Sequence, residues 1–431
     1  MVDASATRQA GGTGDVPEGR IGFRRAVLVL GVLSWLGPFS LDAYTPAFPA
    51  IADDYRTDAA AVQLTLTALV VGLAVGQLVC GALTDAYGRR RPLLWSLVAY
   101  ALATAGCAIA PDVWTLTAAR FAQGATVAMA MVVGRAAARD LFEGRTLARC
   151  YSAISAVTAI APAVGPLVGS QLLLAGSWRW IFVAVTGMAV GALVLSALLL
   201  PETAPPRERV RAGAQLRESL AAFGGLLRSA GFRRTALTLG LSSAVGLTYV
   251  AGAPFLLQEG FGLTPSQFGL VFVGNALTLV VAATISSRLS GRVGPRAVAR
   301  AGLALQLPAT VLSPVLVLAH VPVGFVLGAL AAMVLAHGLV QPNLLTLGMQ
   351  SEPDRAGSAS ALLGIAQFVL GGIAAPLIAT LGIDIGVAMT GGMVALCAAA
   401  CLAAVRLPGA RGRRNGRVAV PILPGHGPTV H

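Results

Sequence analysis

The chain has 431 residues, of which 56% are hydrophobic and only 11% are charged, and its mean hydropathy is +0.77. Soluble globular domains carry about 25% charged residues, so these values exclude an ordinary soluble enzyme. The net charge of +13 arises from 31 basic residues, all of them arginine, against 18 acidic residues.

Apolar segments of membrane-spanning length follow one another along the whole chain. A transmembrane helix needs about 20 mainly apolar residues. In the first half the spans are expected at 26–48, 61–84, 93–110, 113–135, 151–175 and 178–200. In the second half they are expected at 235–257, 268–289, 299–319, 323–346, 359–381 and 385–405. The pattern predicts an all-α integral membrane protein with twelve transmembrane helices in two pseudo-symmetric six-helix bundles.

The segments between and around the spans divide the chain further. Residues 1–25 are polar and glycine-rich and are expected to form a disordered cytoplasmic tail. The two bundles are expected at 26–200 and 233–405, joined by a proline-rich and charged cytoplasmic linker at 201–232. Residues 406–431 form a second cytoplasmic tail.

The arginines predict the orientation. Loops on the cytoplasmic side of membrane proteins are enriched in basic residues. All but three of the 31 arginines lie in the tails, in the linker or beside loops that follow even-numbered spans. The exceptions are Arg56 and Arg179 in the other loops and Arg120 within span four. We therefore expect both termini in the cytoplasm of a multi-pass protein of the cell membrane, and no nucleic-acid partner.

A glycine- and arginine-rich loop follows span two and has a weaker copy in the second half. Gly81 to Arg91 reads GALTDAYGRRR and resembles the G-x-L-x-D-x-x-G-R-[RK]-[RK] loop of the major facilitator superfamily. Ser287 to Arg296 follows span eight at the equivalent position and keeps the glycines and arginines, but it lacks the aspartate.

Two further motifs narrow the resemblance. Arg120 to Gly124 in span four is similar to the R-x-x-Q-G motif of proton-coupled members, and Ala161 to Gly169 in span five is similar to the G-P-x-x-G antiporter motif. Gly37 to Pro46 and Gly357 to Leu362 complete the pattern. Residues 25–405 thus resemble the bicyclomycin and chloramphenicol resistance branch of the drug:proton antiporters. The resemblance implies efflux of small amphiphilic drugs in exchange for protons, by alternating access.

The spans contain one deeply placed carboxylate, Asp42. An intramembrane ionisable residue is costly and is therefore a functional candidate. With span one ending near Pro49, Asp42 is expected about 10 Å below the outer surface and Arg120 about 9 Å below it. We expect them to meet at one depth and to form the proton-coupling pair, in which separation from the guanidinium lets the carboxylate take a proton. A structural role for each, in packing or in capping a broken helix, is the alternative.

Polar and aromatic residues embedded in apolar spans are candidates for contact with substrate, because small-molecule pockets are mostly apolar with a few hydrogen-bonding groups. They are Trp35, Phe39, Tyr44, Gln123, Asn275, Gln341, Asn343 and Gln367. Interhelical hydrogen bonding is the competing interpretation for each of them.

The remaining motif residues are expected to control conformation. Arg89 is expected to pair with Asp140 and to hold the cytoplasmic face closed, and the proline–glycine run of span five is expected to act as a hinge. This latch and hinge set comprises Gly81, Asp85, Gly88, Arg89, Asp140, Pro162, Gly165, Pro166 and Gly169.

Other functions on the same fold stay open. These are export of an endogenous metabolite and proton-linked or facilitative uptake of a nutrient, since fold does not set direction. The sequence contains no metal, nucleophile or nucleotide-binding motif, so we expect no enzyme activity, metal or cofactor, and a gradient as the energy source. The expected partners are a small-molecule substrate, protons and the lipid bilayer, and the protein is expected to be a monomer.

Overall fold

The computed structural model describes residues 21–203, 221–352, 355–381, 383–405 and 407. Most of the predicted tails 1–25 and 406–431, and the middle of the predicted linker 201–232, lie outside the described residues.

Every regular element in the described part of the chain is helical. The first half consists of α1 (Phe23–Asp42), the 3₁₀ turn η1 (Thr45–Ala47), α2 (Phe48–Tyr55), α3 (Ala59–Tyr87), α4 (Arg90–Ala108), α5 (Val113–Leu141), α6 (Gly144–Leu174) and α7 (Arg179–Leu199). Residues 221–228 form a short helix before the second half. The second half consists of α9 (Ala230–Pro254), the π-helix η2 (Phe255–Gly260), α10 (Pro265–Val293), α11 (Pro295–Leu318), α12 (Val323–Ser351), α13 (Ala356–Ala379) and α14 (Ile385–Ala404).

These elements match the predicted spans. Among the described residues, 11 helices or continuous helical paths are long and apolar enough to cross a membrane. The remaining predicted span is α4, which opens on Arg90 and Arg91 and packs against both α5 and α7. Its 19 residues span about 28 Å, close to the thickness of a hydrocarbon core. The predicted fold class, with twelve membrane helices in two bundles, is confirmed.

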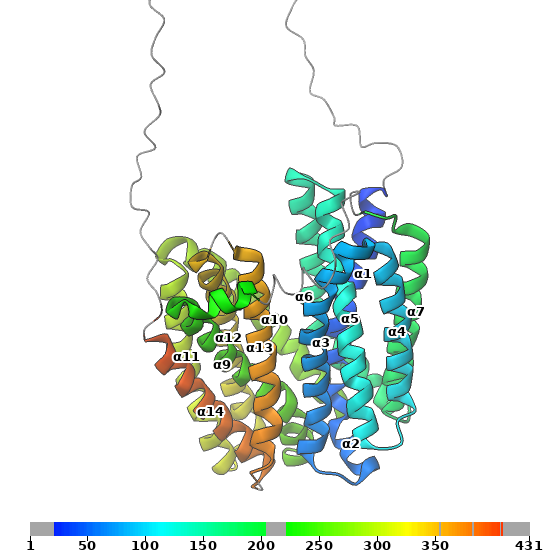
Figure 1. The fold of residues 1–431 in the computed structure, drawn as a ribbon. Helices are drawn as coiled ribbons and strands as arrows, with labels where there is room; N and C mark the ends of the chain where they lie inside the picture. The colour runs from blue at the N-terminus through cyan, green and yellow to red at the C-terminus, as the bar shows by residue number, and fades with distance from the viewer. Residues whose placement is uncertain (1–20, 204–220, 353–354, 382, 406, 408–431) are drawn as a thin grey trace, which may run out of the picture.

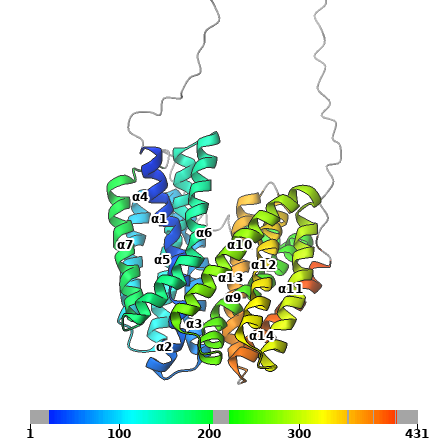
Figure 2. The same ribbon diagram turned by 180° about the vertical axis from the view of Figure 1, so that it is seen from behind.

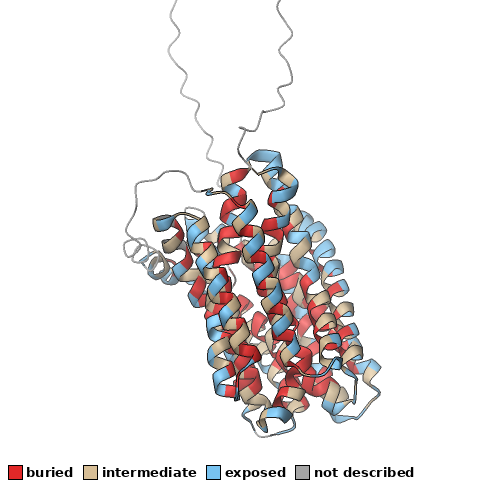
Figure 3. Cartoon of the chain, turned by 90° about the vertical axis from the view of Figure 1, so that its right-hand side faces the viewer, coloured by how far each residue is buried: buried red, intermediate tan, exposed pale blue. Residues whose placement is uncertain are grey.

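The two halves of the chain form two groups of helices that lie side by side (Figure 1). The view from behind shows the same division (Figure 2). Buried residues lie on the inner faces of the helices, and exposed residues lie on the outer faces (Figure 3). The outer faces carry large apolar side chains such as Trp95, Leu198 and Leu402, each at least 75% exposed, as expected of helices that contact lipid.

One end of the bundle carries the start of α1, the end of α14, Arg89 in the loop between α3 and α4, and the first turns of α6 and α11 with Arg145 and Arg296. We call it the arginine-rich end and the other the opposite end. The two halves approach each other closely at the opposite end and diverge toward the arginine-rich end (Figures 1 and 2).

Specific contacts join the halves near the opposite end. They are the ring contact of Phe48 with Phe255 at 6.1 Å, and the hydrogen bonds from Gln258 Nε2 to Pro46 O at 3.0 Å, from Gln171 Nε2 to Ser266 Oγ at 3.1 Å and from Thr67 Oγ1 to Gly372 O. All of these residues lie nearer the opposite end of their helices. The structure is therefore held closed at this end.

The first span of each half is interrupted on its way to the opposite end. In the first half α1 stops at Asp42, and η1 and α2 continue the path to Tyr55. In the second half α9 passes into the π-helix η2 after Pro254. Proline cannot donate an intrahelical hydrogen bond, and Pro46 and Pro254 stand at the two interruptions. The matching breaks show the pseudo-symmetry of the halves.

Three acidic residues at the opposite end are helix N-caps. Asp58, Asp112 and Asp384 accept hydrogen bonds from backbone N–H groups in the first turns of α3, α5 and α14. The bonds from Thr115, together with that from Trp114, lower the pKa of the Asp112 carboxyl. These carboxylates stabilise helix starts.

Candidate functional site

Three residues lie along one face of α1 as it approaches its break. Trp35, Phe39 and Asp42 are spaced four and three residues apart, which places them on the same side of a helix. The Trp35 and Phe39 rings are in contact, with centroids 5.0 Å apart. Trp35 Nε1 is buried without a hydrogen-bond partner in the described part of the chain. This face therefore combines a pair of aromatic rings, tilted by 52° to each other, with an unused donor.

Asp42 is the last residue of α1 and is 9% exposed. Its backbone carbonyl accepts a hydrogen bond from Thr45 Oγ1 at 2.9 Å. Its carboxylate has no ion-pair or hydrogen-bond partner among the residues that the structure describes. A carboxylate in this position is costly to bury as an anion without a partner.

The span continues past Asp42 for about 20 Å, through η1 and α2 to Tyr55. The helical path therefore runs beyond the end near Pro49 on which the expected depth of Asp42 was based. The prediction missed that a helix can resume after a proline-containing turn.

Arg120 is fully buried in the middle of the first half. Its Nη1 donates to Ser40 O at 3.1 Å and to Gln123 Oε1 at 2.7 Å. Its guanidinium carbon lies 4.3 Å from the centroid of the Tyr44 ring and 5.6 Å from that of Phe182. Arginine stays charged at any physiological pH, so aromatic faces and carbonyl dipoles stabilise this cation where no carboxylate does.

Helix α4 completes the environment of Arg120. Gln123 donates to Thr104 Oγ1 at 2.9 Å, and Tyr100 shares a hydrogen bond with Ser40 on α1. The Arg120 Nε and Nη2 atoms are buried without partners in the described part of the chain. Sequence reasoning missed Tyr100, Thr104 and Phe182, because nothing in a single apolar span indicates which neighbouring span it faces.

Asp42 and Arg120 do not form the expected ion pair in this structure. Arg120 does contact the carbonyl of Ser40, two residues before Asp42, so the two residues lie at a similar level. The guanidinium faces Tyr44, whereas Cβ of Asp42 faces Gly165 on α6. The conformation seen here has the carboxylate and the guanidinium separated.

The proline–glycine run of α6 packs directly against the break in α1. A Cβ atom at Gly165 would stand 2.8 Å from Asp42 Cβ, and one at Gly169 would overlap the carbonyl of Ala43. Pro162 and Pro166 lie within the same helix. Only glycine allows α6 to approach the α1 backbone this closely.

The same run also touches the other half of the molecule. A Cβ atom at Gly269 of α10 would stand 3.2 Å from Leu167 Cα and 3.3 Å from Pro166 O. Helix α6 therefore lies between the break in α1 and the start of α10.

Two of the four predicted substrate contacts in the first half have hydrogen-bond partners within the protein. Besides Gln123, Tyr44 has a polar partner, because its hydroxyl shares a hydrogen bond of 2.8 Å with Thr65. Trp35 keeps an unpaired donor, and Phe39 packs against it.

The predicted substrate contacts of the second half also include residues with and without polar partners. Asn275 donates to Tyr249 Oη at 2.7 Å, and Gln341 donates to Ser243 at 3.0 Å. Asn343 donates to Ser286 and to the carbonyl of Leu339, and its Oδ1 accepts a hydrogen bond of 2.5 Å from Ser290 Oγ. Gln367 is half-buried and has no polar partner among the described residues. Asn343 thus joins α10 to α12, as the interhelical alternative expected.

The loop between α3 and α4 carries a network of charged groups. Arg89 Nε lies 3.3 Å from Asp140 Oδ2, so the ion pair expected from the sequence is present. Glu202, which the sequence analysis did not single out, accepts hydrogen bonds from the backbone N–H groups of Arg89 and Arg90 at 2.8 and 3.1 Å. Thr203 also donates to Asp140. The start of the linker is therefore bound to the loop within the first half.

Gly88 gives this loop its shape. Its φ of +85° is disfavoured for other residues, and a Cβ atom there would stand 2.7 Å from Glu202 Oε2. Gly294 occupies the equivalent loop of the second half with a φ of +84°. The backbone conformation of the motif is thus repeated in the second half, although its aspartate is not. The surroundings of Gly81 and the side chain of Asp85 lie outside what the structure describes.

The described residues contain no group of three or more His, Cys, Asp or Glu side chains that could hold a metal ion. His337, alone in span ten, packs against Gly246 of α9, and its Nδ1 atom is buried without a partner in the described part of the chain.

The model of the Major Facilitator Superfamily matches residues 30–376. The chain belongs to the major facilitator superfamily. It is a transporter rather than an enzyme, and it is a multi-pass protein of the cell membrane.

Individual members of the superfamily resemble it along most of its length. It is 37% identical over 352 residues to the uncharacterized MFS-type transporter YdgK of Bacillus subtilis, covering 81% of this chain and 87% of the relative. It is 30% identical over 363 residues to a bicyclomycin resistance protein homolog of Haemophilus influenzae, covering 83% and 89%. The crystal structure of a D-xylose-proton symporter has the same fold, with a TM-score of 0.72 at 14% identity over 90% of this chain and 99% of that one.

Replacement of Gly169 tests the packing of α6 on α1. Gly169→Val places methyl groups where the Ala43 carbonyl lies, so we expect a large loss of thermal stability and of transport activity. The matched control is Gly187→Val on α7, where a Cβ atom meets nothing within 4 Å. Melting of the detergent-purified transporter, followed by fluorescence-detected size exclusion, measures both. Equal stability of the two variants would contradict the packing described here.

The Arg89–Asp140 pair of the transporter is testable by a double-mutant cycle. We expect Arg89→Gln and Asp140→Asn each to slow transport, and the double variant to lose little more than either single variant, because both remove the same contact. Initial rates in membrane vesicles, at matched expression, measure the coupling. Fully additive losses would show that the two residues act independently.

Proposed function

We propose that this transporter exports small amphiphilic compounds from the cytoplasm in exchange for protons. The observation that carries the proposal is the buried Asp42 carboxylate, which has no partner in the described part of the chain and lies in the middle of a membrane-spanning path. An intramembrane acid of this kind is expected to serve ion or substrate movement. The resemblance to the bicyclomycin resistance protein homolog supports drug-like substrates.

In the proposed orientation the arginine-rich end faces the cytoplasm and the transporter acts as a monomer. The asymmetry of the arginines supports this orientation. The conformation described here is then closed to the outside by the contacts around Phe48 and Phe255.

Asp42 is proposed to bind the proton and Arg120 to set its affinity. With the guanidinium turned toward Tyr44, the carboxylate has no adjacent cation and favours the protonated form. Movement of α1 that brings the two groups together would favour the carboxylate anion and release the proton. The alternation of the two arrangements would couple the proton to the cycle.

The substrate is proposed to lie against the face of α1 that carries Trp35, Phe39 and Asp42. The aromatic pair offers apolar contact, and the unpaired Trp35 Nε1 offers a donor to a carbonyl or hydroxyl group. With one acid on this face, neutral or weakly charged compounds, such as those resembling chloramphenicol or bicyclomycin, are favoured over dications.

The α6 run and the Arg89 network are proposed to control alternation. Gly165 and Gly169 contact the break in α1, and Leu167 contacts α10, so a shift of α6 moves the proton site relative to the other half. Arg89 and Asp140 hold the loop of the first half in one shape.

Replacement of Asp42 tests proton coupling. We expect Asp42→Asn to lose substrate-driven proton movement, because an amide cannot take up and release a proton in the physiological range. Everted membrane vesicles carrying a fluorescent pH probe measure this movement across a panel of neutral antibiotics.

Asp58→Asn is the matched control, because Asp58 is a helix N-cap at the opposite end and lies away from the proposed site. It should keep the wild-type response at matched expression. Proton-coupled efflux that persists in Asp42→Asn would overturn the assignment. Substrate flux without proton movement in the wild type would indicate a facilitator.

A further inference from the structure

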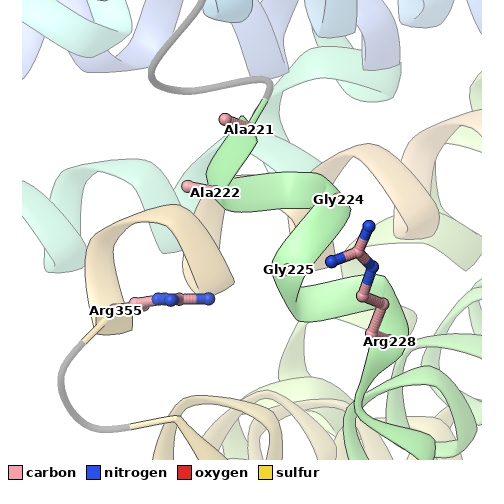
Figure 4. A pocket seen from close by; sticks show the side chains of 6 residues that line it. All are labelled: Ala221, Ala222, Gly224, Gly225, Arg228 and Arg355. Atoms are coloured by element: carbon pink, nitrogen blue, oxygen red, sulfur yellow. The ribbon is translucent and has the colours of Figure 1, made fainter.

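A cavity of about 620 Å³ lies at the arginine-rich end of the second half, outside the proposed transport site. It is lined by Ala221, Ala222, Gly224, Gly225 and Arg228 of the short helix at 221–228 and by Arg355 at the start of α13. Arg355 extends toward the short helix at Gly225, and Arg228 projects from the next turn of that helix (Figure 4). The cavity thus combines two cations with a floor of small apolar residues.

The short helix is fixed to the second half by its other side. Leu226 is fully buried, and Phe223 packs against the same cluster, which includes Phe232 and Leu344. This anchoring turns the alanine and glycine side of the helix outward. The cavity is therefore a surface feature of the second bundle, beside the starts of α9 and α13.

Arg355 packs against the short helix at Gly225. A Cβ atom at Gly225 would overlap Arg355 Nη1, so the guanidinium lies directly against the helix backbone. Any larger residue at Gly225 must displace the guanidinium.

Both guanidiniums are exposed and have unused donors. Neither Arg228 nor Arg355 makes a side-chain hydrogen bond or ion pair with another residue in the part of the chain that the structure describes. Guanidinium groups bind phosphate oxygens with two parallel hydrogen bonds, and they do so more specifically than ammonium groups. Two of them at one cavity favour a phosphate ligand.

The surroundings favour a lipid as the source of that phosphate. Basic pockets beside transmembrane helices at the cytoplasmic surface suit anionic headgroups, and the apolar floor suits glycerol and the first methylenes of an acyl chain. We propose that this cavity binds an anionic phospholipid, whose phosphate is held by Arg228 and Arg355. Only the choice of leaflet rests on the proposed function; the binding site does not.

Lipid binding to the full-length protein, purified in detergent, tests this proposal. Native mass spectrometry measures the binding of phosphatidylglycerol, of phosphatidylcholine as a lipid with the same phosphate and no net charge, and of inorganic phosphate. We expect preference for phosphatidylglycerol, with binding about tenfold weaker in Arg228→Gln and in Arg355→Gln, as the loss of a charge-assisted hydrogen bond implies.

Further variants distinguish binding at this site from a general effect of positive charge and from a folding defect. Arg292→Gln removes an exposed arginine at the same end of the molecule and should bind as the wild type does. Gly225→Val keeps every charge but displaces Arg355, and it should weaken binding, while Arg355→Lys should retain part of it.

Three results would overturn the proposal. They are wild-type lipid binding in both glutamine variants, equal weakening in Arg292→Gln, and displacement of phosphatidylglycerol by inorganic phosphate, which would assign the cavity to a soluble anion. Binding is measured without substrate or proton gradient, so its failure leaves the proposed export untouched, and failure of export leaves the lipid site untouched.

Discussion

The first bundle is organised around a single buried cation. Arg120 on α5 is held by the carbonyl of Ser40 on α1 and by the faces of Tyr44 and Phe182, and Gln123 ties it to α4. Removing such a cation from water costs several kcal/mol even after relaxation. The helices that satisfy it must therefore stay close together. We therefore expect the bundle to move as a unit, because its centre cannot open without leaving this charge exposed or without partners.

Arg120 is fixed by these contacts, whereas the surroundings of the Asp42 carboxylate are free to change. It stands at the end of α1, where the helix is already broken, and it faces α6 rather than Arg120. A local change in α1 and α6 can alter its surroundings without disturbing the contacts of the guanidinium. A permanently charged residue and a nearby titratable one are the two parts that the proposed proton switch requires.

The fold was predictable to a large extent because apolar runs of about 20 residues are an unusually strong signal. A broken helix at Asp42 was expected only as the alternative, and the span was expected to end near Pro49, whereas η1 and α2 continue it to Tyr55. The Arg89–Asp140 pair was predictable from a local motif, whereas the contact of Glu202 with that loop joins residues more than 100 positions apart. Asn343 illustrates the same limit, because a polar residue in an apolar span reads alike whether it faces a substrate or a serine on a neighbouring helix.

The most direct test of the account is proton release on substrate binding by the purified protein. The transporter is placed in weakly buffered detergent solution near neutral pH with an indicator dye, and a chloramphenicol-like compound is added. The account predicts release of protons from the wild type and none from Asp42→Asn, with bound substrate confirmed in both by equilibrium dialysis. Equal release from the two proteins would show that the proton exchanged for substrate is not carried by Asp42.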